Sequence, residues 1–404
     1  MKKIILTSLL LFSNYFGVCQ KTARFELVES IPVETDLDNP GIRNAPEVWL
    51  EMINNARSSL DIEQFYISTQ KGEPLEEIIS AMVNAANRGV QIRILVDSKM
   101  YKTYPETVDT LGKQKNTSVR IIDFGKLAGG IQHSKYFISD GEDVFIGSQN
   151  FDWRALKHIH ELGVHVKHDE LAKLYQDIFN LDWKLSENNR PDDIRKYLRQ
   201  KKYPAPFSII NSVNDTMLLY PTMSPIGIIP DSTLWDETNI VRLIDKASTE
   251  LSCQFLTYSP VTREKTFYAV LDNALRRAAV RGVKVRMIVS DWSKNHPTVD
   301  HLKSLSLVPN IQIKFSSIPD WSGGYVSFSR VEHCKYLVID SSACWIGTSN
   351  WEKSYFYNSR NLGLIVKSQT VAKQVRSIFL KSWENQYTDL IKPEIEYTLR
   401  KHGE

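Results

Sequence analysis

The sequence predicts an α/β fold made of two tandem homologous domains, each a mixed β-sheet flanked by helices, related by a pseudo-twofold axis. Three observations predict it. A polar motif occurs twice, 200 residues apart. Apolar patterns typical of helices and strands surround each copy in the same order. With 404 residues, the chain is long enough for two domains with complete hydrophobic cores.

The repeated motif consists of a histidine, a lysine, an aspartate and an asparagine at the same spacings in both copies. Its members are His133, Lys135, Asp140 and Asn150 in the first copy and His333, Lys335, Asp340 and Asn350 in the second. The alternative is a duplication whose polar residues only cap strands, but a packing repeat would preserve apolar positions instead. We therefore expect each copy to supply half of one site.

The first 20 residues, 1–20, are predicted to be a signal peptide. Lys2 and Lys3 precede an apolar run at residues 4–12, and a more polar stretch follows, which is typical of a cleavable export signal. The run is too short to span a bilayer, and the alternatives are a buried first helix and a lipoprotein anchored through Cys19. We expect an exported protein, periplasmic or secreted, rather than a lipoprotein.

The rest of the chain is predicted to divide into two domains. Residues 21–194 form the first and residues 214–404 the second, with residues 195–213 as the linker. Pro204 and Pro206 lie in this linker, where proline interrupts regular structure.

Each domain contains a helix that runs directly into a strand. Residues 75–97 and 267–291 both show apolar residues at helical spacing, then Arg-Gly-Val, then an apolar strand. Gly89 and Gly282 stand where each helix ends, as a left-handed C-terminal cap requires. Each half therefore reads as strand, helix, strand, helix, strand, followed by the motif.

The motif itself is predicted to lie on paired strands. Residues 134–139 and 334–339 have the pattern of strands, with a motif histidine before each one. Residues 144–146 and 343–346 are expected to be the next strands. The glycine after each of these then turns the chain, so that Asn150 and Asn350 face the same cleft.

Composition excludes several classes of protein. Hydrophobic content of 42% and charged content of 24% are ordinary for a globular protein, and the net charge of +3 provides no general attraction for nucleic acid. The four cysteines show neither a disulfide framework nor metal-ligand spacing, and Cys334 is expected to be a core residue. We expect no cofactor and no metal.

The motif residues suit the transfer of a phosphoryl group. A neutral imidazole can attack phosphorus and form a covalent intermediate, and a second, protonated imidazole can donate a proton to the leaving oxygen. Lysine and asparagine side chains supply donors for the charge that develops on the phosphoryl oxygens. His133 and His333 are expected to divide the two histidine roles, in an order that the sequence leaves open.

Two further pairs of residues are expected to support the histidines. Asp140 and Asp340 lie at the far end of each motif strand, and we favour a structural role, in which they bind a basic or backbone donor and fix the domain interface. Direct chemistry is the alternative. Glu161 and Asn361 stand 28 residues after the two histidines and are expected to orient them. Because a carboxylate favours the imidazolium form and an amide does not, the two pKa values would differ. A surface strand position is the alternative for Glu161.

The chain resembles the phospholipase D superfamily. The two motifs carry this resemblance, together with Gly-Ser-Gln-Asn-Phe-Asp-Trp-Arg at residues 147–154, Glu-Leu-Gly-Val at 161–164 and Gly-Thr-Ser-Asn-Trp at 347–351. These runs are most similar to the animal lysosomal members three and four and to related bacterial and poxviral proteins. The resemblance implies a phosphohistidine intermediate and a single site formed by both motifs. It also implies 5′ exonuclease action on single-stranded nucleic acid, or phosphatidyl transfer.

The leading hypothesis is thus a metal-independent phosphodiesterase that acts as a 5′ exonuclease on single-stranded nucleic acid. The alternatives are a phospholipase D or phosphatidyl transferase, which needs an apolar rim such as residues 217–220 or 226–230, and a non-catalytic binding protein. A monomer suffices for one site, with a weak dimer and peripheral membrane contact as open alternatives.

Residues 321–325 are expected to form a loop at the cleft edge. Aromatic residues near the motifs are candidates for stacking on bases, although at least half are expected to be core: Phe151, Trp153, Trp351, Tyr355, Phe356 and Tyr357.

Overall fold

The computed structural model describes residues 23–210, 216–262 and 264–403. The expected signal peptide, with Cys19, lies outside the described residues, and so does part of the expected linker. Within the described ranges, no helix has the length and apolar character needed to cross a bilayer.

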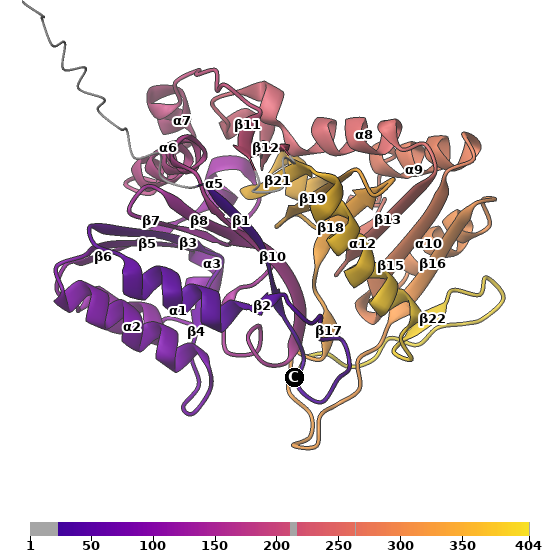
Figure 1. Ribbon diagram of the computed structural model, residues 1–404, viewed down its shortest axis with the longest axis horizontal. Helices are drawn as coiled ribbons and strands as arrows, with labels where there is room; N and C mark the ends of the chain where they lie inside the picture. The colour runs from indigo at the N-terminus through magenta and orange to yellow at the C-terminus, as the bar shows by residue number, and fades with distance from the viewer. Residues whose placement is uncertain (1–22, 211–215, 263, 404) are drawn as a thin grey trace, which may run out of the picture.

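Two mixed sheets form the framework, one from each half of the chain (Figure 1). In the described residues the first sheet has nine strands. In spatial order they are β2 (Arg43–Asn44), β1 (Arg24–Ser30), β10 (Ile159–Lys167), β8 (Asp143–Gly147), β7 (Tyr136–Ser139), β3 (Ser59–Gln64), β5 (Gln91–Asp97) and β6 (Thr117–Ile122), with β17 (Val331–Glu332) also pairing with β10.

The second sheet repeats this order. Its strands are β11 (Phe207–Ile210), β12 (Thr216–Ser224), β21 (Asn361–Lys367), β19 (Ala343–Gly347), β18 (Lys335–Ile339), β13 (Glu250–Phe255), β15 (Lys284–Ser290), β16 (Ile311–Ser316) and β22 (Thr388–Leu390). Two short parallel pairs lie apart from the sheets: β4 (Ile67–Ser68) with β9 (Phe151–Asp152), and β14 (Tyr258–Ser259) with β20 (Trp351–Glu352). The shared strand order confirms the predicted fold class of two tandem α/β domains.

Helices cover both sheets. The longer ones are α1 (Ala45–Asn55), α2 (Leu75–Asn87), α6 (Asp169–Leu185), α8 (Asp236–Lys246), α9 (Val270–Val280), α10 (Thr298–Ser306) and α12 (Gln369–Glu384). The shorter ones are α3 (Ser98–Tyr101), α4 (Glu106–Gly112), α5 (Phe124–Ala128), α7 (Pro191–Tyr197) and α11 (Lys353–Tyr357), with 3₁₀ turns η1 (Ile226–Ile228), η2 (Ser232–Leu234) and η3 (Asp291–Lys294). As predicted, Gly89 and Gly282 terminate α2 and α9: each stands two positions after the last helical residue, with φ angles of 102° and 89°.

The two halves share one hydrophobic core. Side chains of α6 and α12 pack together with inward-facing residues of both sheets, while α1 with α2 and α8 with α9 cover separate cores on the outer sides. The Tyr175 hydroxyl of α6 donates to the Gly363 carbonyl of β21, 3.0 Å away. Burial of so much apolar surface between the halves fixes their relative position.

The predicted domain boundaries stay a prediction, and one short strand pairs across them. β17 belongs to the second half of the sequence but pairs in parallel with β10 of the first, with His160 opposite Glu332. β11 lies inside the range expected as linker and pairs with β12. In Figure 1, β10 and β17 run along the line where the two halves meet.

Candidate active site

Each motif histidine is attached to the opposite half of the chain. The His133 amide donates to the Arg360 carbonyl and the His333 amide to the His160 carbonyl, both at 2.9 Å. The histidines therefore precede β7 and β18 at the seam between the halves. The two histidines are only 4% and 8% exposed as whole residues, so little of either is open to solvent.

The His133 ring is oriented by an amide. Its Nδ1 atom lies 3.0 Å from Oδ1 of Asn361. The Asn361 amide nitrogen donates to the Tyr355 carbonyl at 2.9 Å, and the Thr348 hydroxyl donates to Oδ1 at 3.0 Å, which fixes Oδ1 toward the ring. Nδ1 of His133 must therefore carry the proton of the neutral ring, and Nε2 carries its lone pair. Burial, Lys135 and Lys335 hold the pKa of His133 well below its usual value.

The His333 ring is oriented by a carboxyl group. Its Nδ1 atom lies 2.7 Å from Oε2 of Glu161, which is fully buried. Burial raises the pKa of Glu161 well above its usual value, while burial and the two lysines hold the pKa of His333 well below its own. The His333–Glu161 pair can therefore hold one proton more than the His133–Asn361 pair, because a carboxyl group takes up a proton and an amide does not.

The two lysines have the same geometry. Lys135 donates to the His133 carbonyl and Lys335 to the His333 carbonyl, each at 2.6 Å, and both side chains are fully buried. Burial lowers the pKa of Lys335 to about 8, and burial with the charge of Lys335 lowers that of Lys135. Each lysine also lowers the pKa of the histidine in the other copy, so the charges of both motifs act at one place.

Asn150 and Asn350 are buried at the ends of the turns after β8 and β19, and no described protein atom donates to either side-chain carbonyl oxygen. Close backbone contacts position these turns. A Cβ atom on Gly147 would lie 2.7 Å from Cα of Gly163 in β10. The glycines of the motif are therefore needed for close strand packing rather than only for a turn.

Asp140 and Asp340 are not brought to the histidines. Asp140 accepts hydrogen bonds from the amides of residues 57–59 at the start of β3. Asp340 does the same with residues 248–250 before β13, at 2.8 to 3.0 Å. The hydroxyls of Ser58, Ser248 and Thr249 donate as well. Backbone donors are as expected for a structural role, but the contacts lie within one half and not at the domain interface.

Aromatic packing distinguishes the surroundings of His133. The rings of Phe65 and Tyr355 lie 5.1 and 4.8 Å from its ring, and Nζ of Lys135 lies 4.9 Å from the centre of Phe65. The positions equivalent by sequence in the other half are Leu256 and Ala155. Phe65 carries no motif, so no sequence signal identified it.

Most of the aromatic residues considered as stacking candidates lie in the core. Phe151, Trp153, Trp351 and Phe356 are buried, whereas Tyr355 and Tyr357 are partly exposed. The loop at residues 321–325 is mainly exposed, and the Ser322 amide donates to Glu34 of the first half at 2.7 Å.

Comparisons with known proteins agree with this geometry. A family model described as "Cardiolipin synthase, PLD-like domain" matches residues 49–183 and 240–383. The 5'-3' exonuclease PLD3 of Xenopus laevis is 31% identical over 411 residues, which cover 92% of this chain and 81% of that protein. Phospholipase D Z of Dictyostelium discoideum is 30% identical over 383 residues, covering 90% of each chain. The chain belongs to the phospholipase D superfamily and is a phosphodiesterase of that superfamily.

A solved structure shares the fold. The crystal structure of phosphatidylserine synthase from Haemophilus influenzae Rd KW20 superposes with a TM-score of 0.60 at 16% sequence identity, over 86% of this chain and 85% of that one. The two-sheet architecture is therefore common to both proteins.

The position of Asp340 leads to a prediction about stability. Hydrogen bonds from the backbone of residues 248–250 outweigh the effect of burial and lower the pKa of Asp340 to about 2. A carboxyl group with a depressed pKa stabilises the folded state at pH values above its usual pKa of 3.8. This stabilisation is lost as the pH falls toward 2. Asp340→Asn should lower the free energy of unfolding by about 1 kcal/mol at pH 7, since solvent screens part of the charge. The difference from the unsubstituted protein should shrink between pH 4 and pH 2, while kcat changes little.

Denaturant unfolding over this pH range provides the measurement. Asp389→Asn, an exposed aspartate in β22, is the matched control and should change nothing. A large loss of kcat with unchanged stability would instead place Asp340 in the chemistry.

Proposed function

We propose that this protein is a metal-independent 5′ exonuclease on single-stranded nucleic acid that acts through a phosphohistidine intermediate. One observation carries the mechanism: the two histidines have different partners, an amide for His133 and a carboxyl group for His333. The duplicated motif therefore has two chemically distinct halves. The residues proposed to take part are His133, Lys135, Asn150, His333, Lys335, Asn350 and, as a positioning residue, Glu161. Asp140 and Asp340 are proposed to be structural.

In the first step, Nε2 of His133 attacks phosphorus. The P–N bond forms as the bond from phosphorus to the leaving oxygen breaks, and His333 transfers the proton of the His333–Glu161 pair to that oxygen. In the second step, water attacks the phosphohistidine. His333 takes a proton from the water, the P–N bond breaks, and the free lone pair of His133 is restored.

The lysines and asparagines would stabilise the transition state. The ammonium groups of Lys135 and Lys335, each bonded to the carbonyl of its motif histidine, and the buried amides of Asn150 and Asn350 are proposed as donors to the phosphoryl oxygens. In a buried site each such electrostatic contact is stronger than in water. The negative charge of a bound phosphodiester favours the protonated form of both lysines, which opposes the effect of burial on their pKa.

Three observations support a nucleic acid substrate. Several relatives at about 30% identity over most of the chain are named as 5'-3' exonucleases. The low exposure of both histidines suits a substrate that enters by the end of a single strand. The partly exposed Tyr355 beside His133 offers a ring for a terminal base. We also propose that the protein is exported, in line with the expected signal peptide.

A lipid substrate is the second candidate, because another relative is named Phospholipase D Z. The apolar rim expected for it is poorly supported. Met217 and Leu219 are buried in β12, and Ile226 is 38% exposed at the start of η1. A single exposed side chain of this kind is ordinary for a protein surface.

The role of the His333–Glu161 pair can be tested through the leaving group. Glu161→Gln should lower kcat by roughly 10²–10⁴-fold on a dinucleotide, whose leaving oxygen needs a proton. It should slow the first step much less on a nucleoside p-nitrophenyl phosphodiester, because nitrophenolate leaves without one. Burst kinetics of nitrophenolate release measure that step, with the exposed Glu77→Gln as control. Equal losses on both substrates would contradict the assigned acid.

The substrate class can be tested by parallel turnover assays in EDTA. Single-stranded oligonucleotides with 5′-hydroxyl or 5′-phosphate ends form one arm, and vesicles of phosphatidylcholine or phosphatidylglycerol the other, with His333→Ala as the blank. We expect stepwise release of nucleotides from the 5′ end. Headgroup release with inert oligonucleotides would identify the lipid function, and activity only after a divalent ion is added would contradict the metal-independent mechanism.

A further inference from the structure

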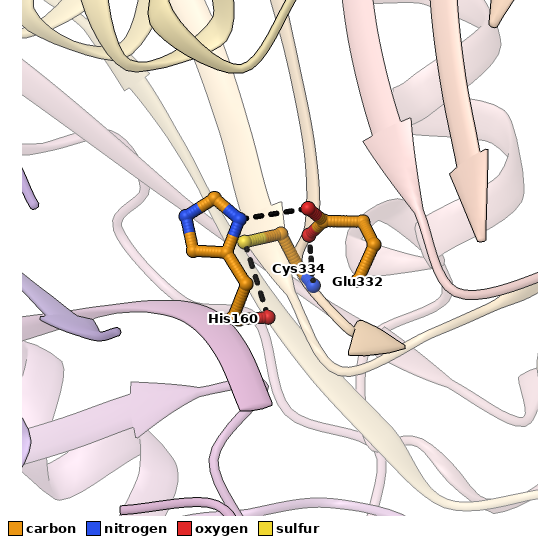
Figure 2. A group of neighbouring side chains, drawn as sticks. All are labelled: His160, Glu332 and Cys334. Carbon is orange, nitrogen blue, oxygen red and sulfur yellow. Dashed lines mark hydrogen bonds and ion pairs between the residues drawn. The ribbon is translucent and has the colours of Figure 1, made fainter. Parts of the chain in front are cut away.

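Three potential metal ligands converge next to the second motif. His160 at the start of β10 lies beside Glu332 of β17 and Cys334, which immediately precedes β18 (Figure 2). Their ligand atoms all lie within 4.8 Å of one another, and Nδ1 of His160 is 2.7 Å from Oε2 of Glu332. All three side chains are at most 1% exposed. The Cys334 amide also donates to Oε1 of Glu332 at 3.0 Å, and its thiol donates to the His160 carbonyl at 3.6 Å, so the three groups are held together away from solvent.

The other half of the molecule provides an internal comparison. The residues at the equivalent positions are Arg360, Gln132 and Ser134, and Gln132 pairs with Arg360 just as Glu332 pairs with His160. There Arg360 binds Asp182 through bonds of 2.6 and 2.7 Å, whereas His160 binds Glu332 within the cluster itself. The residue equivalent to Asp182 is Ser382. Beside the first motif, this position holds an arginine–aspartate pair. Beside the second motif, the equivalent position holds residue types that can bind a metal.

We propose that His160, Glu332 and Cys334 form a binding site for a divalent transition metal ion of the Zn²⁺ class. Nitrogen, oxygen and sulfur donors together are the ligand types that zinc accepts, with a solvent molecule as the fourth donor of a tetrahedral ion. The negative charges of one thiolate and one carboxylate would offset the two positive charges of the metal ion, so the buried complex would be neutral. Binding releases the thiol proton of Cys334 and the proton held between His160 and Glu332.

The ion would join the two halves without entering the chemistry. His160 comes from the first half and the other two ligands from the second, so the metal would clamp the β10–β17 pairing. Glu332 and Cys334 stand on either side of His333, and alternation along an extended chain directs their side chains away from that of His333. The inference is independent of the proposed substrate, and chelation should leave kcat at 25 °C nearly unchanged.

Metal uptake by the untagged full chain tests the site directly. After chelator treatment and dialysis against Zn²⁺ alone, we expect about one tightly held zinc per chain and a rise in the thermal unfolding midpoint. Dialysis against Co²⁺ should give a thiolate-to-cobalt charge-transfer absorption band, which reports a metal–sulfur bond.

Two variants are designed from the first motif. Cys334→Ser and Glu332→Gln introduce the residues that the equivalent positions already carry, so both should fold, which a thermal melt of the metal-free proteins checks. Cys334→Ser should abolish the absorption band, and both variants should lose tight zinc uptake and the rise in the midpoint. Cys253 is another buried cysteine, so Cys253→Ser is the matched control. It should keep the absorption band, the tight zinc uptake and the rise in the midpoint. No zinc uptake by the unsubstituted protein, or an unchanged band in Cys334→Ser, would overturn the proposal.

Discussion

The attachment of each motif histidine to the opposite half is the constraint on which the site depends. A backbone hydrogen bond and a ring-orienting side chain both cross the seam, so neither histidine can be placed correctly by its own half. The shared core of α6 and α12 holds this seam rigidly, because close-packed interiors do not deform gradually. Precise placement of both rings is what in-line attack and proton donation require.

Duplication explains the architecture, and divergence between the copies explains the proposed chemistry. A symmetrical site would contain two equivalent histidines. Replacement of the carboxyl group of Glu161 by the amide of Asn361 leaves a proton on one side and a free lone pair on the other. The aromatic residues lie beside His133 and the ligand cluster lies beside His333, so both extend the same asymmetry between the two histidines.

Much of this organisation could be predicted because it is local or repeated. Helical periodicity followed by Arg-Gly-Val fixed the positions of α2 with β5 and of α9 with β15, and equal spacing in the motifs indicated two related domains. Equal spacing from the motifs also indicated that Glu161 and Asn361 orient the histidines, but it did not indicate that each contacts the histidine of the other half. The position of Asp140 was predicted in part, because the motif indicates a structural aspartate but not which backbone amides it binds.

The features that could not be predicted depend on contacts between distant segments. The pairing of β10 with β17 joins residues from the two halves, and no pattern in either strand specifies its partner. His160 and Glu332 are 172 positions apart, so their spacing resembles no metal-binding motif. Phe65 lies beside His133 only because β3 and β7 pair in the sheet, which places the residues next to both strands close together.

Direct location of the covalent intermediate tests the central claim most directly. His333→Ala, mixed with a nucleoside p-nitrophenyl phosphodiester and quenched in base, should accumulate a nucleotidyl group, because the histidine that activates water is missing. Peptide mass spectrometry should place the group on His133. The same experiment is run on His133→Ala. If the nucleotidyl group is then found on His333, and none is found on His133 in the first experiment, the assigned roles are reversed and the account is contradicted.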